Sequence, residues 1–274
     1  MSAPSFLVRG SRPLVLGHRG DSAHYPENTL LGLRQALRAG ADGVELDVMR
    51  CASGEVVVVH DDDLLRVAQK LPGSERAVRR STLTELRGFD LGSGERLPTL
   101  AEVCEELGPQ ALINVELKSP EPHDKKDHLQ LLRDDGLAAA VADVLRRVGR
   151  LPPAGRRTGD RGEVTLISSF DPLQLLRFLA CTDALPVGYL FHREQGAVMR
   201  NLWRLPDLPL RAVHPEAALI DAVSLRMWRA AGLYVHTWTV DNPHEIAALW
   251  TLGVDAIITN QPGAVMAQIT SGAP

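Results

Sequence analysis

The sequence is poor in aromatic residues and in cysteine. Aromatic residues make up 4% of the 274 residues, so a folded core must be filled largely by Leu, Val, Ile and Ala. The three cysteines, Cys51, Cys104 and Cys181, lie far apart and have neither the spacing of a metal site nor that of a disulfide framework. Their number and spacing therefore indicate a reducing compartment.

The sequence also lacks an excess of positive charge and any long hydrophobic run. Its formal net charge of −4 argues against nucleic acid as the main partner, and a small phosphate-bearing ligand would have to be bound by a few placed cations. No apolar stretch approaches the roughly 20 residues of a transmembrane helix, and the apolar residues 6–8 are too few for a signal-peptide core. We expect a cytoplasmic protein without a transmembrane segment; the sequence does not determine its oligomeric state.

Apolar residues make up 45% of the chain, enough for one large α/β domain spanning residues 1–274. Short apolar runs typical of buried strands alternate with helical patterns. The expected strands are residues 14–17, 44–49, 112–117, 164–168, 187–190, 210–213, 234–238 and 256–259, and the expected longer helices are residues 28–39, 100–107, 136–148, 172–180, 217–230 and 243–252. Eight alternating strand and helix units predict a (β/α)8 TIM barrel.

A ninth strand-like run, residues 56–59, follows the second strand too closely to belong to the barrel. Six residues, 50–55, connect the two runs, whereas a parallel crossover needs a dozen or more. The pair is therefore expected to form an antiparallel β-hairpin that places His60 roughly across from Glu45. Two polar stretches rich in Pro, Gly or Arg are expected to be surface loops, residues 66–81 and 150–162.

Charged and proton-carrying side chains line or follow these strands. His18 and Arg19 come directly after the first strand, at the end of the barrel where active sites lie. Glu45 and Asp47 alternate with apolar residues, so both point to one face of the second strand, and the apolar face must pack against helices. The two carboxylates therefore face the barrel axis, where they would repel each other unless a cation lay between them.

Glu116 and Lys118 share one face at the end of the strand at residues 112–117. Three carboxylates from two strands suit one hard divalent cation, Mg²⁺ or Ca²⁺. Lys118 and the arginine after the first strand would suit phosphate oxygens. His18 and His60 are then left as general acid and general base.

Other polar residues are expected to be structural. Asn28 is well placed as the N-cap of the helix at residues 28–39, and Glu27 would only orient a neighbour. The remaining histidines lack paired partners in the sequence and receive no functional role.

The motifs around these residues occur in an order typical of one enzyme family. They are His18-Arg19-Gly20, Pro26-Glu27-Asn28-Thr29, Glu45-Leu46-Asp47-Val48, His60-Asp61, Glu116-Leu117-Lys118, Ser169-Phe170, Trp238-Thr239-Val240 and the run from Asp255 to Pro262. With this ordered set, which extends over most of the chain, the sequence resembles the glycerophosphodiester phosphodiesterase family.

The resemblance implies a TIM-barrel hydrolase that cleaves glycerophosphodiesters to glycerol 3-phosphate and an alcohol, with a divalent cation as cofactor. The matched residues are His18 and His60 as the catalytic pair, Glu45, Asp47 and Glu116 as metal ligands, Arg19 and Lys118 as phosphate contacts, and Trp238 near the substrate mouth. The chain departs from the family pattern at Leu65 to Lys70, after His60-Asp61, which leaves the head-group preference open.

Three alternatives stay open at this point. A phosphatidylinositol-type phospholipase C is also a barrel with two histidines, although the three carboxylates favour a metal-dependent enzyme. A catalytically silent barrel could bind a phosphodiester as a sensor, but no expected residue is replaced. Lysophospholipids are a third possibility for the substrate. The sequence does not determine which histidine is the acid, or whether water or the glycerol hydroxyl attacks first.

Overall fold

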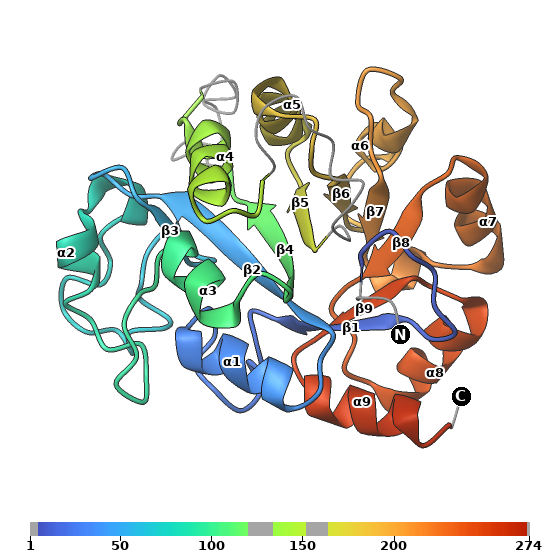
Figure 1. The fold of residues 1–274 in the computed structure, drawn as a ribbon, viewed down its shortest axis with the longest axis horizontal. Helices are drawn as coiled ribbons and strands as arrows, with labels where there is room; N and C mark the ends of the chain where they lie inside the picture. The colour runs from blue at the N-terminus through green and yellow to red at the C-terminus, as the bar shows by residue number, and fades with distance from the viewer. Residues whose placement is uncertain (1–4, 120–133, 152–163, 273–274) are drawn as a thin grey trace.

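Eight parallel strands form a closed barrel with helices around it (Figure 1). The computed structural model describes residues 5–119, 134–151 and 164–272. The barrel strands are β1 (Leu14–His18), β2 (Gly43–Arg50), β4 (Leu112–Leu117), β5 (Thr165–Ser169), β6 (Val187–Phe191), β7 (Ala212–Pro215), β8 (Tyr234–Thr237) and β9 (Ala256–Thr259). They are bonded in the order β1-β9-β8-β7-β6-β5-β4-β2, and β1 pairs with β2 to close the ring. The expected (β/α)8 barrel is confirmed.

The ninth strand, β3 (Val56–Val58), lies outside the ring as the second arm of a hairpin. It pairs antiparallel with the end of β2, where Val48 lies opposite Val58. The hairpin is therefore confirmed. The backbone N–H of Val59 donates to the carbonyl of Asp47, so His60 directly follows the residue opposite Asp47, about one residue from the position expected across from Glu45.

The helices between the strands largely follow the expected pattern. They are α1 (Leu30–Arg38), α2 (Leu83–Leu86), α3 (Leu100–Leu107), α4 (Leu137–Arg147), α5 (Pro172–Cys181), α6 (Ala197–Arg200), α7 (Ala222–Ala230), α8 (Pro243–Leu252) and α9 (Pro262–Thr270). The single helix expected at residues 217–230 is wrong: a 3₁₀ turn ends at Leu219, and α7 begins anew where the carboxylate of Asp221 caps two backbone N–H groups. Helix α9 was not expected, although a proline at its first position is a typical start signal.

The main apolar core lies between the outer faces of the strands and the surrounding helices. Val44, Leu46 and Val48 alternate along β2 and are fully buried in it. Because side chains alternate across a strand, this packing turns Glu45 and Asp47 toward the barrel interior.

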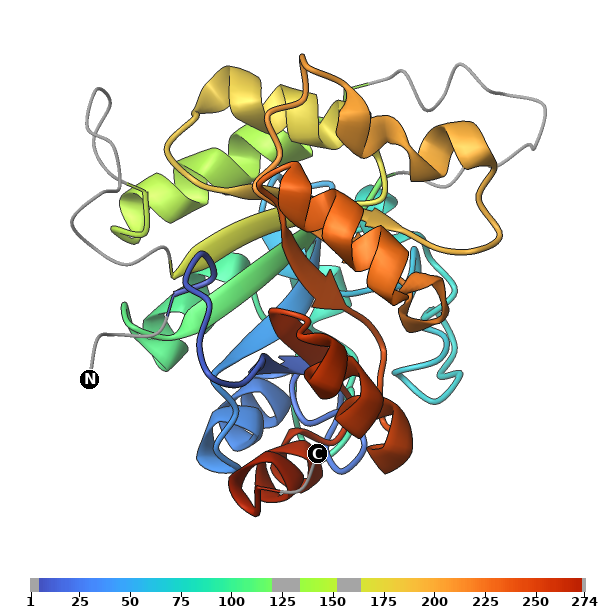
Figure 2. The same ribbon diagram turned by 90° about the vertical axis from the view of Figure 1, so that its right-hand side faces the viewer.

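Phe6 and Leu7 close the barrel at the N-terminal ends of its strands. Both are buried in an apolar cluster that includes Leu112 and Ala212, the first residues of β4 and β7. The C-terminal strand ends are therefore the end that carries polar side chains. Helices α1 and α9 lie side by side on the outside, as both views show (Figures 1 and 2).

The surface loop expected at residues 66–81 is wrong in part. Ala68 and Val78 are completely buried in a second apolar cluster, together with Val57 of β3. This packing fixes the segment that follows His60 against the hairpin. Of the second expected loop, residues 150–162, only the first two lie within the described residues.

Candidate active site

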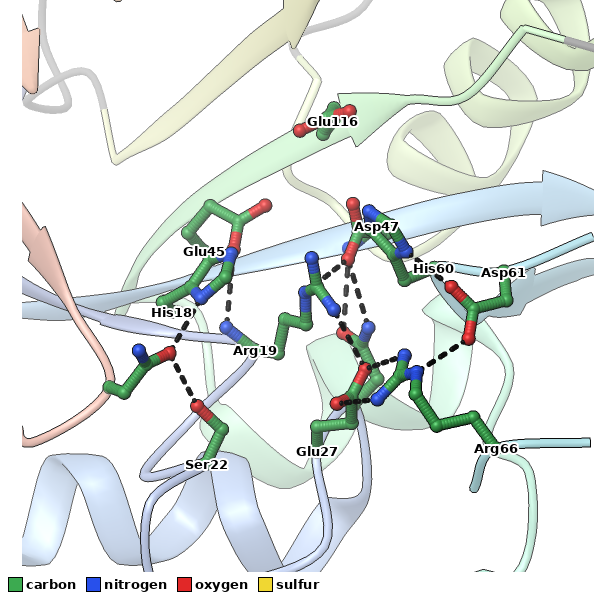
Figure 3. A network of polar contacts seen from close by, with 12 residues as sticks. His18, Arg19, Ser22, Glu27, Glu45, Asp47, His60, Asp61, Arg66 and Glu116 are labelled. Atoms are coloured by element: carbon green, nitrogen blue, oxygen red, sulfur yellow. Dashed lines mark hydrogen bonds and ion pairs between the residues drawn. The ribbon is translucent and has the colours of Figure 1, made fainter. Parts of the chain in front are cut away.

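Three carboxylates meet inside the barrel near the C-terminal ends of β2 and β4. Glu45 and Asp47 come from β2, and Glu116 of β4 pairs in register with Asp47. All three side chains are buried, and each offers one oxygen within 4.8 Å of the others. The strand alternation expected from the sequence thus brings them to one point, as Figure 3 shows.

Two cations lie against this acidic cluster. The Nζ of Lys118 lies 3.0 Å from Glu116 Oε1 and 3.6 Å from Asp47 Oδ1. The Nε of Arg19 lies 3.1 Å from Asp47 Oδ2. Within the described part of the chain Glu45 takes part in no ion pair; its carboxylate accepts a hydrogen bond from the backbone N–H of Arg19 at 3.1 Å.

The three carboxylates differ in their affinity for protons. Burial, together with the charges of Asp47 and Glu116, raises the pKa of Glu45 well above its usual value. Burial also opposes ionisation of Asp47, but Lys118 and Arg19 outweigh it and lower the pKa of Asp47 to about 2. Burial raises the pKa of Glu116 despite the charge of Lys118. Folding thus makes Asp47 the most readily ionised of the three carboxyls and Glu45 the one that holds its proton against burial and repulsion.

This donor set fits a hard divalent cation. Mg²⁺ and Ca²⁺ prefer carboxylate oxygens, and the acidic cluster supplies three of them in a small buried volume. A cation here would also offset the burial and the repulsion from Asp47 and Glu116 that together raise the pKa of Glu45.

His18 lies at the end of β1, beside Glu45 (Figure 3). Its Nδ1 is 2.7 Å from the side-chain oxygen of Asn260, which also accepts a hydrogen bond from the hydroxyl of Ser22. Burial and the nearby charge of Arg19 lower the pKa of His18. The neutral imidazole is therefore its main form near neutral pH.

His60 is held by a carboxylate that belongs to a chain of charged groups. Its Nδ1 lies 2.7 Å from Asp61 Oδ1, and the other oxygen of Asp61 accepts from Arg66 Nε at 2.8 Å. Arg66 also donates to Glu27, which in turn accepts from Arg19 at 2.9 Å (Figure 3). This chain links the two sides of the site, so Glu27 does more than orient one neighbour.

The helix N-cap expected at Asn28 is wrong. Thr29 caps α1 by accepting a hydrogen bond from the backbone N–H of Gly32. Asn28 adopts a left-handed conformation with φ of 54° and donates from Nδ2 to Asp47 Oδ2 at 3.0 Å. An asparagine tolerates this conformation better than most residues, and its amide then supports the acidic cluster.

Trp238 lies just past β8, at the same end of the barrel. Its indole N–H donates to the carbonyl of His214 at 2.8 Å, and its ring stands edge-on to Phe170 with the ring centroids 5.3 Å apart. Both rings are only partly buried.

Sequence reasoning missed the roles of Asn28, Arg66 and Asn260. Asn260 directly follows β9, as Arg19 directly follows β1, and this position at a strand end could have revealed it. Arg66 had no such signal, because its contact with Glu27 spans 39 residues and depends on the loop conformation.

The barrel and its polar centre define a class of protein, a (β/α)8-barrel enzyme with acidic, basic and imidazole groups gathered at the C-terminal strand ends. The sequence model of the glycerophosphoryl diester phosphodiesterase family matches residues 18–264, and the chain belongs to this family. The expected enzyme class, a glycerophosphodiester phosphodiesterase, is thereby confirmed.

Individual proteins resemble the chain over nearly its whole length. A glycerophosphodiester phosphodiesterase of Caldanaerobacter subterraneus subsp. tengcongensis is 28% identical over 95% of this chain and 99% of its own. A phosphodiesterase of Oleispira antarctica, solved in complex with its product sn-glycerol-3-phosphate, has a TM-score of 0.77 at 28% identity, over 94% of this chain and 97% of its own. A glycerophosphodiester phosphodiesterase structure from Thermotoga maritima has a TM-score of 0.71 at 29% identity, over 93% and 97% of the two chains.

Proposed function

We propose that this enzyme hydrolyses glycerophosphodiesters to glycerol 3-phosphate and an alcohol, using one divalent cation and a histidine acid–base pair. The observation that carries the proposal is the acidic cluster of Glu45, Asp47 and Glu116, with oxygens within 4.8 Å of one another. Arg19 and Lys118 lie directly beside it. The glycerol 3-phosphate bound by the Oleispira antarctica relative supports the substrate class.

In this proposal the acidic cluster holds Mg²⁺ or Ca²⁺, and Arg19 and Lys118 bind phosphate oxygens. The cation, when bound, would polarise a phosphoryl oxygen and stabilise the charge that develops there. Arg19 presents a planar guanidinium that can donate to two oxygens at once, whereas Lys118 acts as a point charge. Both cations are mostly buried, with side chains 16% and 17% exposed, which strengthens their interaction with a phosphate.

His18 and His60 transfer the protons. One imidazole takes the proton of the attacking hydroxyl as its oxygen bonds to phosphorus, and the other gives a proton to the alkoxide oxygen as its bond to phosphorus breaks. This requirement is the same whether the attacking hydroxyl belongs to water or to the glycerol of the substrate. Each ring is already oriented through Nδ1, by Asn260 and Asp61 respectively.

Trp238 and Phe170 would contact the rest of the substrate. Their edge-on pair at the C-terminal strand ends offers an apolar surface beside the phosphate-binding groups. Within the described residues no helix is long and apolar enough to cross a membrane. A single domain and a cytoplasmic location stay predictions from the sequence.

The test measures release of glycerol 3-phosphate from glycerophosphocholine and glycerophosphoethanolamine, and release of the acylglycerol phosphate from a lysophospholipid. We expect release with Mg²⁺ or Ca²⁺, loss in EDTA, and restoration when either ion is returned. His18→Ala should abolish release, whereas His244→Ala, which removes an exposed histidine at the start of α8, should not. Full activity in EDTA would overturn the metal requirement, and no release from any substrate would overturn the proposed reaction.

A further inference from the structure

We propose that Asp241 acts through Asn260 as a positioning residue that fixes the tautomer of His18, with the proton on Nδ1 and an unprotonated Nε2. The consequence of this tautomer for the reaction rests on the proposed function. The tautomer itself is a property of the metal-free, substrate-free protein and can be measured there.

Asp241 and Asn260 face each other across the last two strands of the barrel. Asn260 follows β9, and Asp241 lies in the connection from β8 to α8. The side-chain amide of Asn260 donates from Nδ2 to Asp241 Oδ2 at 2.6 Å. The other oxygen of Asp241 accepts from the Asn260 backbone N–H and from the Thr259 hydroxyl, both at 2.8 Å.

These contacts determine which way the Asn260 amide points. An ionised carboxylate can only accept hydrogen bonds, so the NH₂ end of Asn260 must face Asp241. Its oxygen then faces His18 Nδ1 at 2.7 Å and the Ser22 hydroxyl at 2.9 Å. The reverse orientation would place the amide oxygen against the carboxylate and leave two acceptors without a donor, which is costly in this partly buried site.

The amide orientation in turn determines the tautomer. An amide oxygen can only accept, so Nδ1 of His18 must carry a proton, and the neutral ring then has a lone pair on Nε2. Nε2 lies on the side of the ring away from Asn260, and the ring lies beside Glu45 (Figure 3). In the proposed reaction this tautomer lets neutral His18 accept a proton at Nε2.

The two histidines are therefore held by different chemistry. His60 donates directly to the carboxylate of Asp61. The carboxylate on the His18 side lies one residue further away, behind a neutral amide. Asp241 thus sets the direction of the hydrogen bond between Asn260 and His18 without placing its own negative charge in contact with the imidazole ring.

The first measurement is a long-range ¹H–¹⁵N spectrum of the histidine rings in metal-free protein, with His18 assigned by its loss in His18→Ala. We expect a protonated Nδ1 and an unprotonated Nε2 in the wild type. In Asp241→Asn the new amide should keep its oxygen on Thr259 and donate to Asn260. The Asn260 amide should then reverse and donate to His18 Nδ1, so the proton of the ring should move to Nε2.

The second measurement is hydrolysis of the best substrate by the same proteins. Asp241→Asn should lower kcat by about 10²-fold or more, the contribution typical of a general base, with little change in KM. The double variant Asp241→Asn with Asn260→Asp places a carboxylate next to His18 and an amide donor behind it. It should restore the Nδ1–H tautomer, and its kcat should be at least tenfold higher than that of Asp241→Asn alone.

Asp255→Asn is the matched control. Asp255 precedes β9, at the end of that strand opposite to Asn260, and its carboxylate accepts a hydrogen bond from the backbone N–H of Val235 in β8. It should leave the ring spectrum and kcat unchanged. A wild-type spectrum with the proton on Nε2, or an Asp241→Asn variant that keeps both the Nδ1–H spectrum and the wild-type kcat, would overturn the proposal. If the wild type shows the expected tautomer but no hydrolysis, the positioning role stands and the proposed function fails.

Discussion

Glu45→Gln is expected to make the metal-free protein more stable while it removes the response to metal. Glu45 lacks an ion pair among the described residues, and its carboxylate lies in a cluster with Asp47 and Glu116. Glutamine has nearly the same shape and can still accept the hydrogen bond from the backbone of Arg19. The substitution therefore removes a charge with little change in packing.

The expected gain follows from the spacing of the charges. Two unit charges 4.8 Å apart repel by about 3.5 kcal/mol at an effective dielectric constant of about 20. Arg19 pairs with Asp47 and Lys118 pairs with Glu116, and these two positive charges offset part of the repulsion that Glu45 experiences. A net gain of about 1–3 kcal/mol in the free energy of unfolding remains near neutral pH.

The gain should depend on pH in a defined direction. Because folding raises the pKa of Glu45 above its ordinary value of 4.5, the folded state holds this proton more tightly than the unfolded state. The free energy of unfolding of the wild type therefore falls as the pH rises from 4.5 to the raised pKa. Glutamine does not ionise, so the variant does not show this decrease. The two proteins should be equally stable below about pH 4 and diverge above it.

Urea unfolding in EDTA across this pH range measures the effect, and repetition with Mg²⁺ or Ca²⁺ measures the stabilisation by metal. A ligand at 100 times its Kd should stabilise the wild type by about 2.7 kcal/mol, and Glu45→Gln much less. A variant that is less stable than the wild type in EDTA at pH 7, or one that keeps the full metal response, would refute the charge argument.

Three further substitutions probe single contacts. Arg66→Ala should lower kcat at least tenfold, because Asp61 loses the arginine that orients it. The free energy of unfolding in urea should fall by no more than about 1 kcal/mol, because Arg66 is half exposed. A variant with the kcat of the wild type would contradict this role. Gly188→Ala should lower the unfolding free energy by about 1–3 kcal/mol, because the new Cβ would lie 2.5 Å from Nε2 of buried His214; an unchanged Tm would exclude that contact. Thr29→Ala should cost about 1 kcal/mol through loss of the α1 cap, and Thr29→Ser should recover most of it.

The sequence determined the barrel and the composition of the site. Apolar strands alternate with helical patterns along the chain, and local propensity with hydrophobic periodicity is enough to specify the (β/α)8 order. The alternation of Glu45 and Asp47 with apolar neighbours fixed the direction of both carboxylates, because a barrel strand has one face toward the helices and one toward the axis.

Other local signals were insufficient. Asn28 and Thr29 are adjacent and both are good N-cap residues, so the sequence could not tell which one starts α1. The N-cap is Thr29 because the side chain of Asn28 donates its hydrogen bond to Asp47 instead of capping the helix. The hairpin register likewise depends on the pairing of β3 with β2 and on the hydrogen bond between Val59 and Asp47, and it decided where His60 lies along β2.

Only the tertiary structure decided how His18 is held, whereas His60 is held by its neighbour in the chain, Asp61. Asn260 lies 242 residues after His18, and they meet because β9 pairs with β1 to close the ring. Hydrogen-bond direction then passes from Asp241 through Asn260 to the imidazole. Residue types and spacing specify which groups are present in a site, but the donor and acceptor geometry between distant strands specifies which atom of each group carries the proton.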